Sequence, residues 1–377
     1  MPLRIAGGFV RTEANLKKHR EAGIQWRLLS KRGGMARIGV LTGGGDCPGL
    51  NAAIRAIVRK GAEHYGHALL GFRNGYKGVL DGTATELTPA NARGILHRGG
   101  TILGTSRVNP FKVEGGVDLV KDTLRSNGID GLIVIGGEGT LRCAAKLSGE
   151  GVNVVGVPKT IDNDLAGTDY TFGFDTAVQI ATDAIDRLHT TAESHNRVMV
   201  LEVMGRNAGW IGLHAGLAGG ADVILIPEHP FDMADVCDHL EHRHSSGHLF
   251  SIVVVSEGAR PVAGTMDIHP YELDEYGRER LGGISNPIAA EIERSTGFET
   301  RVTILGHVQR GGTPTAYDRV LATRYGVAAI DLASKGEWGR MASLRGTQIV
   351  DVPLDAAASN LKTVPEDLYR LAEVFFG

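Results

Sequence analysis

Cysteine, long apolar runs and net charge are all scarce in this chain. Its 377 residues include three cysteines, Cys47, Cys143 and Cys237, an odd number without the spacing of a disulfide framework. Such usage is typical of a reducing compartment, so we expect a cytoplasmic protein. The longest apolar runs, such as SIVVVS at 251–256, are far shorter than the ~18 residues that cross a membrane. The formal net charge is −3, so no overall field attracts nucleic acid or an acidic membrane, and we expect neither as a partner.

Glycine, in contrast, is abundant. The chain has 53 glycines, about twice the roughly 7% share of an average protein. They form short runs beside apolar, strand-like segments. This placement indicates backbone that approaches a ligand closely, because a flexible linker would not alternate with apolar strands.

Strand-like and helix-like segments alternate from residue 36 onward. The strand-like runs are ARIGVLTGGG, GIDGLIVIGG, VNVVGVP, RVMVLEVMG, ADVILIP, FSIVVVSEG and RVTILG. Alternation of this kind predicts an α/β fold, with parallel sheets flanked by helices. About 340 such residues exceed one comfortable core, so we expect two domains. Ligands in such folds bind beyond the carboxyl ends of the strands, which is where the glycines and charges gather here.

Two segments depart from the alternation. Residues 1–34 carry eight lysines and arginines against two glutamates. A targeting peptide can have this charge balance, but serine is scarce and an apolar core is lacking. We therefore expect a loosely ordered extension or non-native sequence, with Met35 as an alternative start. Residues 258–283 are polar with turn residues at both ends, and we expect an inserted loop or small hairpin there.

The first glycine-rich turn, TGGGDCPGLN at 42–51, follows a strand and opens a helix. Unpaired amides at a helix start attract phosphate, helped by the helix dipole. The turn is no Walker loop, because Gly49 is followed by Leu50 and Asn51. It is no dinucleotide fingerprint either, because Pro48 stands where the third glycine belongs. The residues alone leave two interpretations open, an anion site and a tight strand–helix turn.

A second turn, GGEGT at 136–140, also ends a strand and starts a helix. The charge of Glu138 would repel phosphate unless a cation lay between them. We therefore expect Mg²⁺ to bridge this carboxylate and the phosphates. The alternative is an exposed glutamate that only complements the helix dipole.

The third turn, PKTIDNDL at 158–165, crowds charges at the exit of a buried strand. Lys159 can neutralise phosphate, and Asp162 or Asp164 can accept a proton from an attacking hydroxyl. Taken alone, an Asx-type turn capped by the aspartates is the simpler interpretation.

Together these turns and several further motifs resemble the 6-phosphofructokinases, over about residues 36–345. The motifs are GVLTGGGDCPGLNAAIR, LGTSR, IGGEGT, PKTIDNDL, ESHNRVMVLEVMGRNAGW, SEGAR and TILGHVQRGGTPTAYDR. The resemblance is to the phosphofructokinase A family and implies an ATP-dependent enzyme that phosphorylates fructose 6-phosphate at its 1-hydroxyl with Mg-ATP. It also implies two similar, Rossmann-like domains with the active site in the cleft between them. We expect residues 35–172 plus 309–345 to bind nucleotide, and 173–308 plus 346–377 to bind the sugar phosphate.

The resemblance further implies roles for individual residues. It places nucleotide contacts at Gly45, Arg107, Val108, Gly137, Glu138, Gly139 and Thr140. Glu138 stands at the Mg²⁺ position, where many members have aspartate. Asp162 matches the general base for the 1-hydroxyl, with Lys159, Thr160 and Arg206 as further catalytic residues. Sugar-phosphate contacts are implied at Thr160, Ile161, Asp162, Met204, Gly205, Arg206, Glu257, His307, Val308, Gln309 and Arg310.

Two further arginines are implied to act between subunits. Arg197 and Arg301 match residues that reach the 6-phosphate bound by a neighbouring subunit. The resemblance therefore implies a homo-oligomer, a tetramer or a dimer, whose sites are completed by the neighbour.

The choice of phosphoryl donor rests on two positions. Pyrophosphate users of this family carry aspartate where this chain has Gly139, and an aspartate there would collide with the α-phosphate of ATP and repel it. Lys159 favours pyrophosphate, because pyrophosphate users and a mixed-substrate subgroup have lysine there. The insertion at 258–283 also resembles the mixed subgroup. We predict ATP as the donor and give Gly139 more weight than Lys159. An aspartate at position 139 would exclude ATP by steric clash and charge repulsion, whereas an additional cation such as Lys159 does not exclude it. A pyrophosphate-dependent fructose 6-phosphate 1-phosphotransferase is the alternative.

Two other classes of protein share some of these features. Kinases of NAD and of lipids also carry GGEGT-like loops, but they lack the MGR and GHVQRGG segments. A non-catalytic, nucleotide-binding subunit would be expected to lose Asp162 or Arg206, and both are present.

Overall fold

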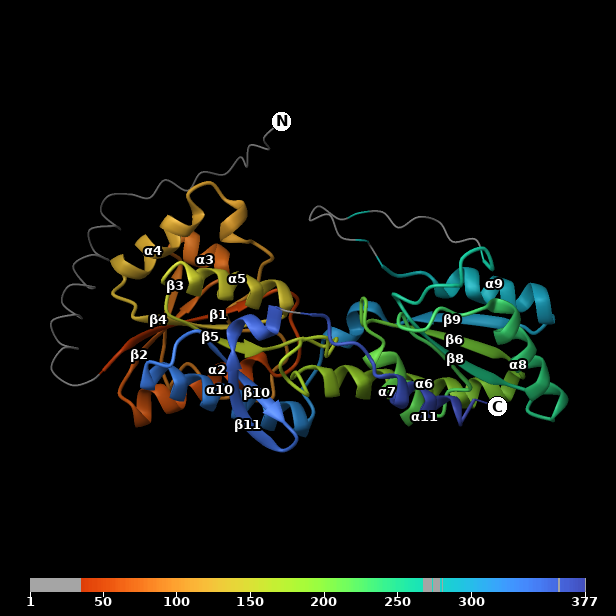
Figure 1. The fold of residues 1–377 in the computed structure, drawn as a ribbon. Coiled ribbons are helices and arrows are strands. Elements are labelled where there is room, and N and C mark those ends of the chain that lie inside the picture. The colour runs from red at the N-terminus through yellow and green to blue at the C-terminus, as the bar shows by residue number, and fades with distance from the viewer. Residues whose placement is uncertain (1–34, 267–272, 274–278, 280, 359, 377) are drawn as a thin grey trace.

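A computed structural model describes residues 35–266, 273, 279, 281–358 and 360–376, which form two sheets flanked by helices (Figure 1). The expected α/β fold with two parallel-rich sheets is confirmed. The extension expected at 1–34 lies outside the described residues, as does most of the middle of the segment 258–283. No helix in the described part of the chain is long and apolar enough to cross a membrane.

The first sheet has seven strands in the order β11-β10-β5-β4-β1-β2-β3. Their bounds are Arg37–Gly43 (β1), Ala68–Phe72 (β2), Ala84–Leu87 (β3), Gly131–Gly136 (β4), Val154–Pro158 (β5), Arg340–Arg345 (β10) and Gln348–Pro353 (β11). The five inner strands pair in parallel, while β3 and β11 close the edges antiparallel. The central strand β4 is buried at every residue, as expected of a parallel strand with helices on both faces.

Helices cover both faces of this sheet. They are α2 (Leu50–Arg59), α3 (Tyr76–Asp81), α4 (Gly116–Ser126), α5 (Glu138–Gly149) and α10 (Ala316–Lys335), with short turns at Lys60–His64 (η1), Pro110–Lys112 (η2) and Leu354–Ala358 (η4). Buried residues of α2 and α10 form one apolar cluster with the sheet, and those of α3, α4 and α5 form another on the opposite face.

The second sheet has four parallel strands in the order β7-β8-β6-β9. Its strands and helices are α6 (Phe174–His195), β6 (Val198–Val203), α7 (Trp210–Gly219), β7 (Val223–Leu225), α8 (Met233–Ser245), β8 (Ser251–Ser256), α9 (Ser285–Thr296), β9 (Thr300–Ile304), η3 (Gly306–Arg310) and α11 (Glu366–Glu373). Buried residues of α8 and α9 pack on one face, and those of α6 and α7 pack on the other.

One expected domain boundary is wrong. We expected residues 346–377 to belong with the second sheet, but β11 pairs antiparallel with β10 along its whole length. A tight turn at Gly346 reverses the chain and lets β11 cover the edge that β10 would otherwise expose. Residues 348–353 therefore belong to the first sheet, and the chain reaches the second sheet again only after them.

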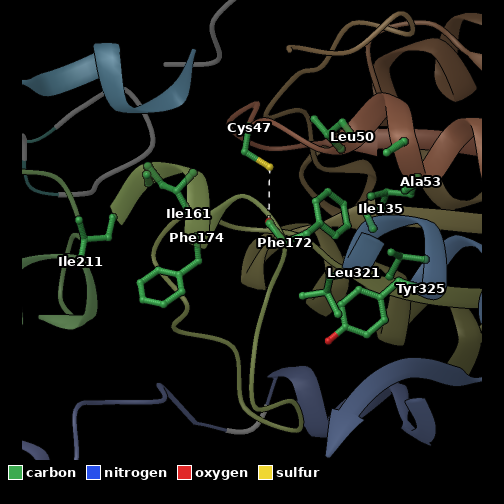
Figure 2. Close-up of a cluster of buried hydrophobic side chains, with 14 of the residues drawn as sticks. Cys47, Leu50, Ala53, Ile135, Ile161, Phe172, Phe174, Ile211, Leu321 and Tyr325 are labelled. Carbon is green, nitrogen blue, oxygen red and sulfur yellow. Dashed lines mark hydrogen bonds between the residues drawn. The ribbon is translucent and has the colours of Figure 1, made fainter. Parts of the chain in front are cut away.

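A shared apolar cluster joins the two sheets. It includes Ile161, Phe172 and Phe174 between the sheets, and it continues to Ile211 on α7 (Figure 2). The start of α6 is also held by a polar joint, because the buried Asp318 of α10 accepts hydrogen bonds from the amides of Gly173 and Thr176, both at 2.8 Å. Burial raises the pKa of Asp318 to about 6. The start of α6 is thus fixed to α10, which packs on the first sheet.

Candidate functional site

The three charged or glycine-rich turns lie side by side, because β1, β4 and β5 are neighbours that run in parallel. The amide of Lys159 donates to the carbonyl of Gly136 at 3.0 Å. Its ammonium donates to the carbonyl of Gly43 at 3.0 Å and also to that of Gly45. Lys159 therefore ties the third turn to both of the others.

Glycines at the ends of β1 and β4 let the first turn of α5 come close. A Cβ on Gly43 would lie 2.7 Å from Cγ2 of Thr140, and one on Gly136 would lie 2.4 Å from its Cβ. Thr140 is also fixed from outside, because the hydroxyl of Tyr76 donates to its carbonyl at 3.1 Å. The start of α5, where we expect nucleotide contacts, is thus seated directly against the strand ends.

The remaining residues of the expected nucleotide set lie around these turns. The carbonyl of Ser106 accepts from the amide of Gly44 at 3.1 Å, which places Arg107 and Val108 next to the first turn. Gly137 is the N-cap of α5 and supplies no side chain to its first amides. Gly139 is exposed. This is a polar, glycine-lined surface of the kind that accommodates phosphates.

Lys159 is almost fully buried, at 2% exposure. Burial lowers the pKa of its ammonium, and the neighbouring Arg310 lowers it too, while Asp162 and Asp46 act in the opposite direction. Its two bonds to the carbonyls of Gly43 and Gly45 show that the lysine supports the first turn.

Asp162 presents a free oxygen at the end of β5. The residue is 5% exposed, and the Thr160 hydroxyl donates to its Oδ2 at 3.3 Å. The Thr160 hydroxyl also accepts from the amide of Asp162 at 3.1 Å, so threonine and not aspartate closes the turn. Oδ1 of Asp162 has no hydrogen-bond partner among the described residues. A buried carboxylate oxygen without a partner is unusual, and it can accept a proton from a bound hydroxyl.

Asp164 is also buried, close to the Asp162 carboxylate. Burial and the charge of the Asp162 carboxylate raise its pKa to about 7, while Lys362 and Arg206 have the opposite effect. Between the two aspartates, Asn163 adopts a left-handed conformation at φ 50°. Its Oδ1 accepts from the amide of Thr171 at 3.1 Å, which holds the turn in shape.

Glu138 can hold a divalent cation only with help from a ligand. Its carboxylate is one-third exposed at the start of α5 and forms an ion pair with Arg142 one turn later. The described residues contain no cluster of three or more metal-ligating side chains. Mg²⁺ often binds through one or two carboxylates plus substrate phosphates and waters, so this donor set fits it. Sequence reasoning missed Arg142, although the i, i+4 spacing was visible.

The expected sugar-phosphate residues gather at the carboxyl ends of the second sheet. Oε1 of Glu257 accepts from the amide of Arg206 at 3.0 Å and more weakly from that of Gly205 at 3.4 Å. The amide of Met204 donates to Oε1 of the buried Gln309 at 2.8 Å. Burial raises the pKa of Glu257, and the charge of Asp162 contributes to this rise, so the two carboxylates lie close enough to interact.

Arg206 has a strained backbone. Its φ of 53° lies in the left-handed region, which non-glycine residues seldom occupy. The carbonyl of Arg206 also packs closely against Gly258, because a Cβ on Gly258 would lie 1.9 Å from the carbonyl oxygen of Arg206. Such strain at a charged residue is typical of functional sites.

Arg310 joins the two sets of residues. It lies on η3 after β9, and its Nη1 donates to the carbonyl of Asp46 in the first turn at 3.4 Å. A Cβ on Gly45 would lie 2.7 Å from the same nitrogen. His307 and Val308 of η3 are exposed, whereas the side chain of Ile161 is buried in the shared cluster, so only its backbone could contact a ligand.

Arg197 and Arg301 are not part of this group within one chain. They lie at the amino end of the second sheet, where both pair with the carboxylate of Glu299. Arg197 precedes β6 and Arg206 follows it, a separation of roughly 20 Å at about 3.3 Å per residue. One chain therefore cannot bring these arginines to the ligand that Arg206 would hold.

Comparisons with known proteins show the family of this chain. The family profile described as Phosphofructokinase matches residues 37–333. A pyrophosphate–fructose 6-phosphate 1-phosphotransferase from Amycolatopsis methanolica is 59% identical over 341 residues, which are 90% of this chain and 100% of that protein. An ATP-dependent 6-phosphofructokinase from Mycobacterium bovis is 56% identical over 343 residues, with the same coverage of 90% and 100%.

A solved structure shows the same fold. The crystal structure of Pichia pastoris phosphofructokinase in the T-state matches with a TM-score of 0.76 and 34% identity, over 90% of this chain and 39% of that one. This chain thus spans about two fifths of the length of the yeast chain. On the family match and the full-length relatives, the chain belongs to the phosphofructokinase family.

Proposed function

We propose that this chain transfers the γ-phosphoryl group of Mg-ATP to the 1-hydroxyl of fructose 6-phosphate, giving ADP and fructose 1,6-bisphosphate. The observation that carries the proposal is the unpartnered Oδ1 of Asp162, buried where the three turns meet. The two sets of expected residues are in contact, because Arg310 of the sugar-phosphate set donates to the carbonyl of Asp46 in the first turn at 3.4 Å.

Asp162 acts as the general base in this reaction. The sugar 1-oxygen attacks the γ-phosphorus, the new O–P bond forms, and the bond from phosphorus to the β,γ-bridging oxygen breaks. The hydroxyl proton passes to Oδ1 of Asp162. Thr160 orients the carboxylate through its bond to Oδ2. Positioning and charge neutralisation carry most of the rate in phosphoryl transfer, and a positioned base adds about 10²–10⁴-fold.

Cationic groups neutralise the moving phosphate. Arg107 and Arg206 supply guanidinium groups, whose planar fork binds two phosphate oxygens at once. Lys159 acts indirectly, by fixing the carbonyls of Gly43 and Gly45 so that the turn keeps its shape. Bound Mg²⁺ would offset phosphate charge, and Glu138 is the residue that would hold it.

The sugar phosphate is bound by the loops of the second sheet. Met204, Gly205, Arg206, Glu257, His307 and Arg310 surround it in this proposal. Arg197 and Arg301 serve the site of a neighbouring subunit, because their own chain holds them at the far end of the sheet. The enzyme is therefore proposed to work as a homo-oligomer, a tetramer or a dimer.

ATP is the proposed donor because Gly139 is an exposed residue without a side chain in the first turn of α5. The relatives named above divide between pyrophosphate and ATP, so their names support either donor. Lys159 was the residue that favoured pyrophosphate, and its ammonium is occupied by two backbone carbonyls. Pyrophosphate remains the second candidate, supported by the relative from Amycolatopsis.

Assays of fructose 6-phosphate with ATP and with pyrophosphate, side by side, test the proposal. We expect turnover with ATP. Gly139→Asp places a carboxylate against the donor, so its kcat/KM with ATP should fall at least about a hundredfold, because like charges at close range cost several kcal/mol. Gly149→Asp at the other end of α5 is the matched control, since a Cβ there meets no atom within 4 Å. Turnover of the wild-type protein with pyrophosphate alone would contradict the choice of donor.

A further inference from the structure

A segment near the C-terminus contacts the loops of both sheets. Residues 361–364, here called the linking segment, begin with an antiparallel bridge between Leu361 and Leu165. The amide of Lys362 then donates to the carbonyl of Asp164 at 2.9 Å. The linking segment therefore lies directly on the turn that carries Asp162, and no sequence motif pointed to it.

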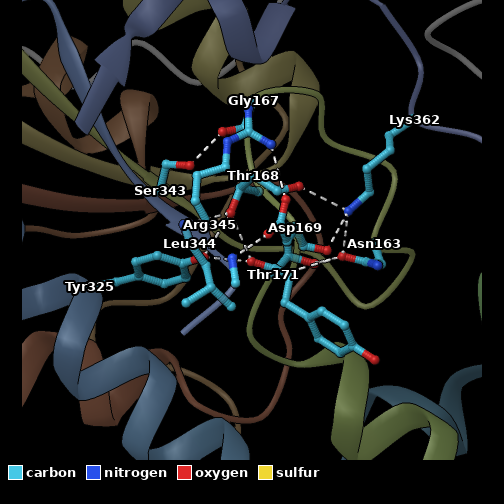
Figure 3. A network of polar contacts seen from close by, with 12 residues as sticks. Asn163, Gly167, Thr168, Asp169, Thr171, Tyr325, Ser343, Leu344, Arg345 and Lys362 are labelled. Atoms are coloured by element: carbon cyan, nitrogen blue, oxygen red, sulfur yellow. Dashed lines mark hydrogen bonds and ion pairs between the residues drawn. The ribbon is translucent and has the colours of Figure 1, made fainter. Parts of the chain in front are cut away.

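The Lys362 ammonium is hydrogen-bonded to the loop that follows Asp162 (Figure 3). It donates to Oδ1 of Asn163 at 2.9 Å, to the carbonyl of Thr168 at 3.0 Å and to that of Asp169 at 2.8 Å. These bonds use all three N–H donors of a lysine. Asn163 immediately follows the proposed base, and its left-handed backbone depends on such support.

The same segment is also fixed to the second sheet. Nε1 of Trp210 donates to the carbonyl of Lys362 at 2.8 Å, and the ammonium lies 5.2 Å from the centre of the indole ring. The amide of Val364 donates to Oε1 of Glu228 at 2.9 Å. Glu228 in turn accepts from the amide of Gly209 at 3.0 Å. Gly209 and Trp210 end the loop that carries Arg206.

We propose that Lys362 is a positioning residue that fixes the loop of Asp162 relative to the loop of Arg206. The inference rests on the proposed function, in which Asp162 takes the proton and Arg206 holds the phosphate. An error of about 1 Å between such groups can cost roughly a hundredfold in rate. Lys362 is assigned no contact with substrate, because its three N–H donors are bonded within the protein.

The charge of Lys362 can be titrated. Asp164 and Asp169 face it from the loop, Arg345 from β10 and His214 from α7. Burial lowers the pKa of Lys362 to about 8, while the two aspartates act in the opposite direction. Above this pH the ammonium loses its charge and one N–H donor, so its hydrogen bond to Oδ1 of Asn163 weakens.

Lys362→Met is the first test, with the exposed Lys335→Met as the matched control. We expect kcat of Lys362→Met to fall at least about tenfold with the KM for fructose 6-phosphate within about twofold, because the loop of the base is loosened and the sugar loop is not. The control should match the wild type. A folded Lys362→Met variant with wild-type kcat would overturn the proposal.

Lys362→Arg is the conservative variant and also covers the case in which Lys362→Met does not fold. A guanidinium stays charged at all working pH values. We expect the wild-type rate to fall above about pH 8, and the decline to move to higher pH in Lys362→Arg. An unchanged decline in Lys362→Arg would count against the proposal.

Hydrogen exchange followed by mass spectrometry separates this inference from the proposed function. The amide of Thr171, bonded to Asn163, should exchange faster in Lys362→Met than in Lys335→Met. If the wild-type protein does not turn over fructose 6-phosphate, the proposed function fails, and the exchange result still decides the positioning role. Equal exchange of residues 160–171 in both variants would refute it.

Discussion

Replacement of Asp164 by asparagine should stabilise the protein, and the gain should depend on pH. Burial raises the pKa of Asp164 to about 7 from a usual 3.8, and the Asp162 carboxylate adds to the rise. The folded state therefore favours the protonated acid. Its contribution to stability is fully present below pH 3.8 and is lost as pH rises towards about 7.

The size of the effect follows from the shift. Each pKa unit corresponds to about 1.4 kcal/mol, so the ionised Asp164 costs the folded state about 4 kcal/mol at most above pH 7. Asparagine has a similar shape and no charge, and it avoids this cost. The gain in unfolding free energy should grow by about 3 kcal/mol between pH 5 and pH 8.5.

Urea unfolding of both proteins at these two pH values measures the gain. The exposed Asp355→Asn on η4 is the matched control and should show no pH-dependent gain. A smaller gain for Asp164→Asn at pH 8.5 than at pH 5 would refute the reasoning. So would a loss of stability at pH 8.5.

Two further predictions concern the proposed chemistry. Asp162→Asn should lower turnover about 10²–10⁴-fold, because an amide cannot take the proton. The KM for fructose 6-phosphate should change little. Near-normal turnover of this variant in steady-state assays would contradict the prediction. Arg142→Ala should lower the Mg²⁺ concentration for half-maximal rate about twofold, because an exposed ion pair of about 0.5 kcal/mol no longer occupies Glu138. Arg125→Ala on α4 is its control, and a higher Mg²⁺ requirement for Arg142→Ala would contradict the interpretation.

Much of the architecture could be predicted from the sequence. Buried parallel strands read as continuous apolar runs, and the three turns after β1, β4 and β5 were identified by their glycines and charges. Their convergence follows from strand order, which local patterns do not encode. The edge strands β3 and β11 were missed, because half-exposed strands mix polar and apolar residues. The largely buried inner strands β2 and β10 were missed as well.

Site residues that belong to sequence motifs could be predicted. Residues that reach the site from a distant part of the sequence could not. Lys362 lies in the unremarkable stretch SNLKTVPED, yet it contacts Asn163, 199 positions earlier. The left-handed backbone of Arg206 was also not predicted, and it lies against Gly258, a residue distant in sequence in the turn after β8. Both features involve contacts between residues that are far apart in the sequence.

The apolar cluster shared by the two sheets also limits where this chain can be divided into fragments. Ile161, Phe172 and Phe174 have no solvent-facing side, since they fill the space between the halves. A fragment cut near residue 172 would present them to water and invite aggregation. A chimaera that exchanges one half between relatives must therefore also exchange the residues of this shared cluster, so that both sides of the contact match. For the same reason, the halves should melt as a single cooperative unit.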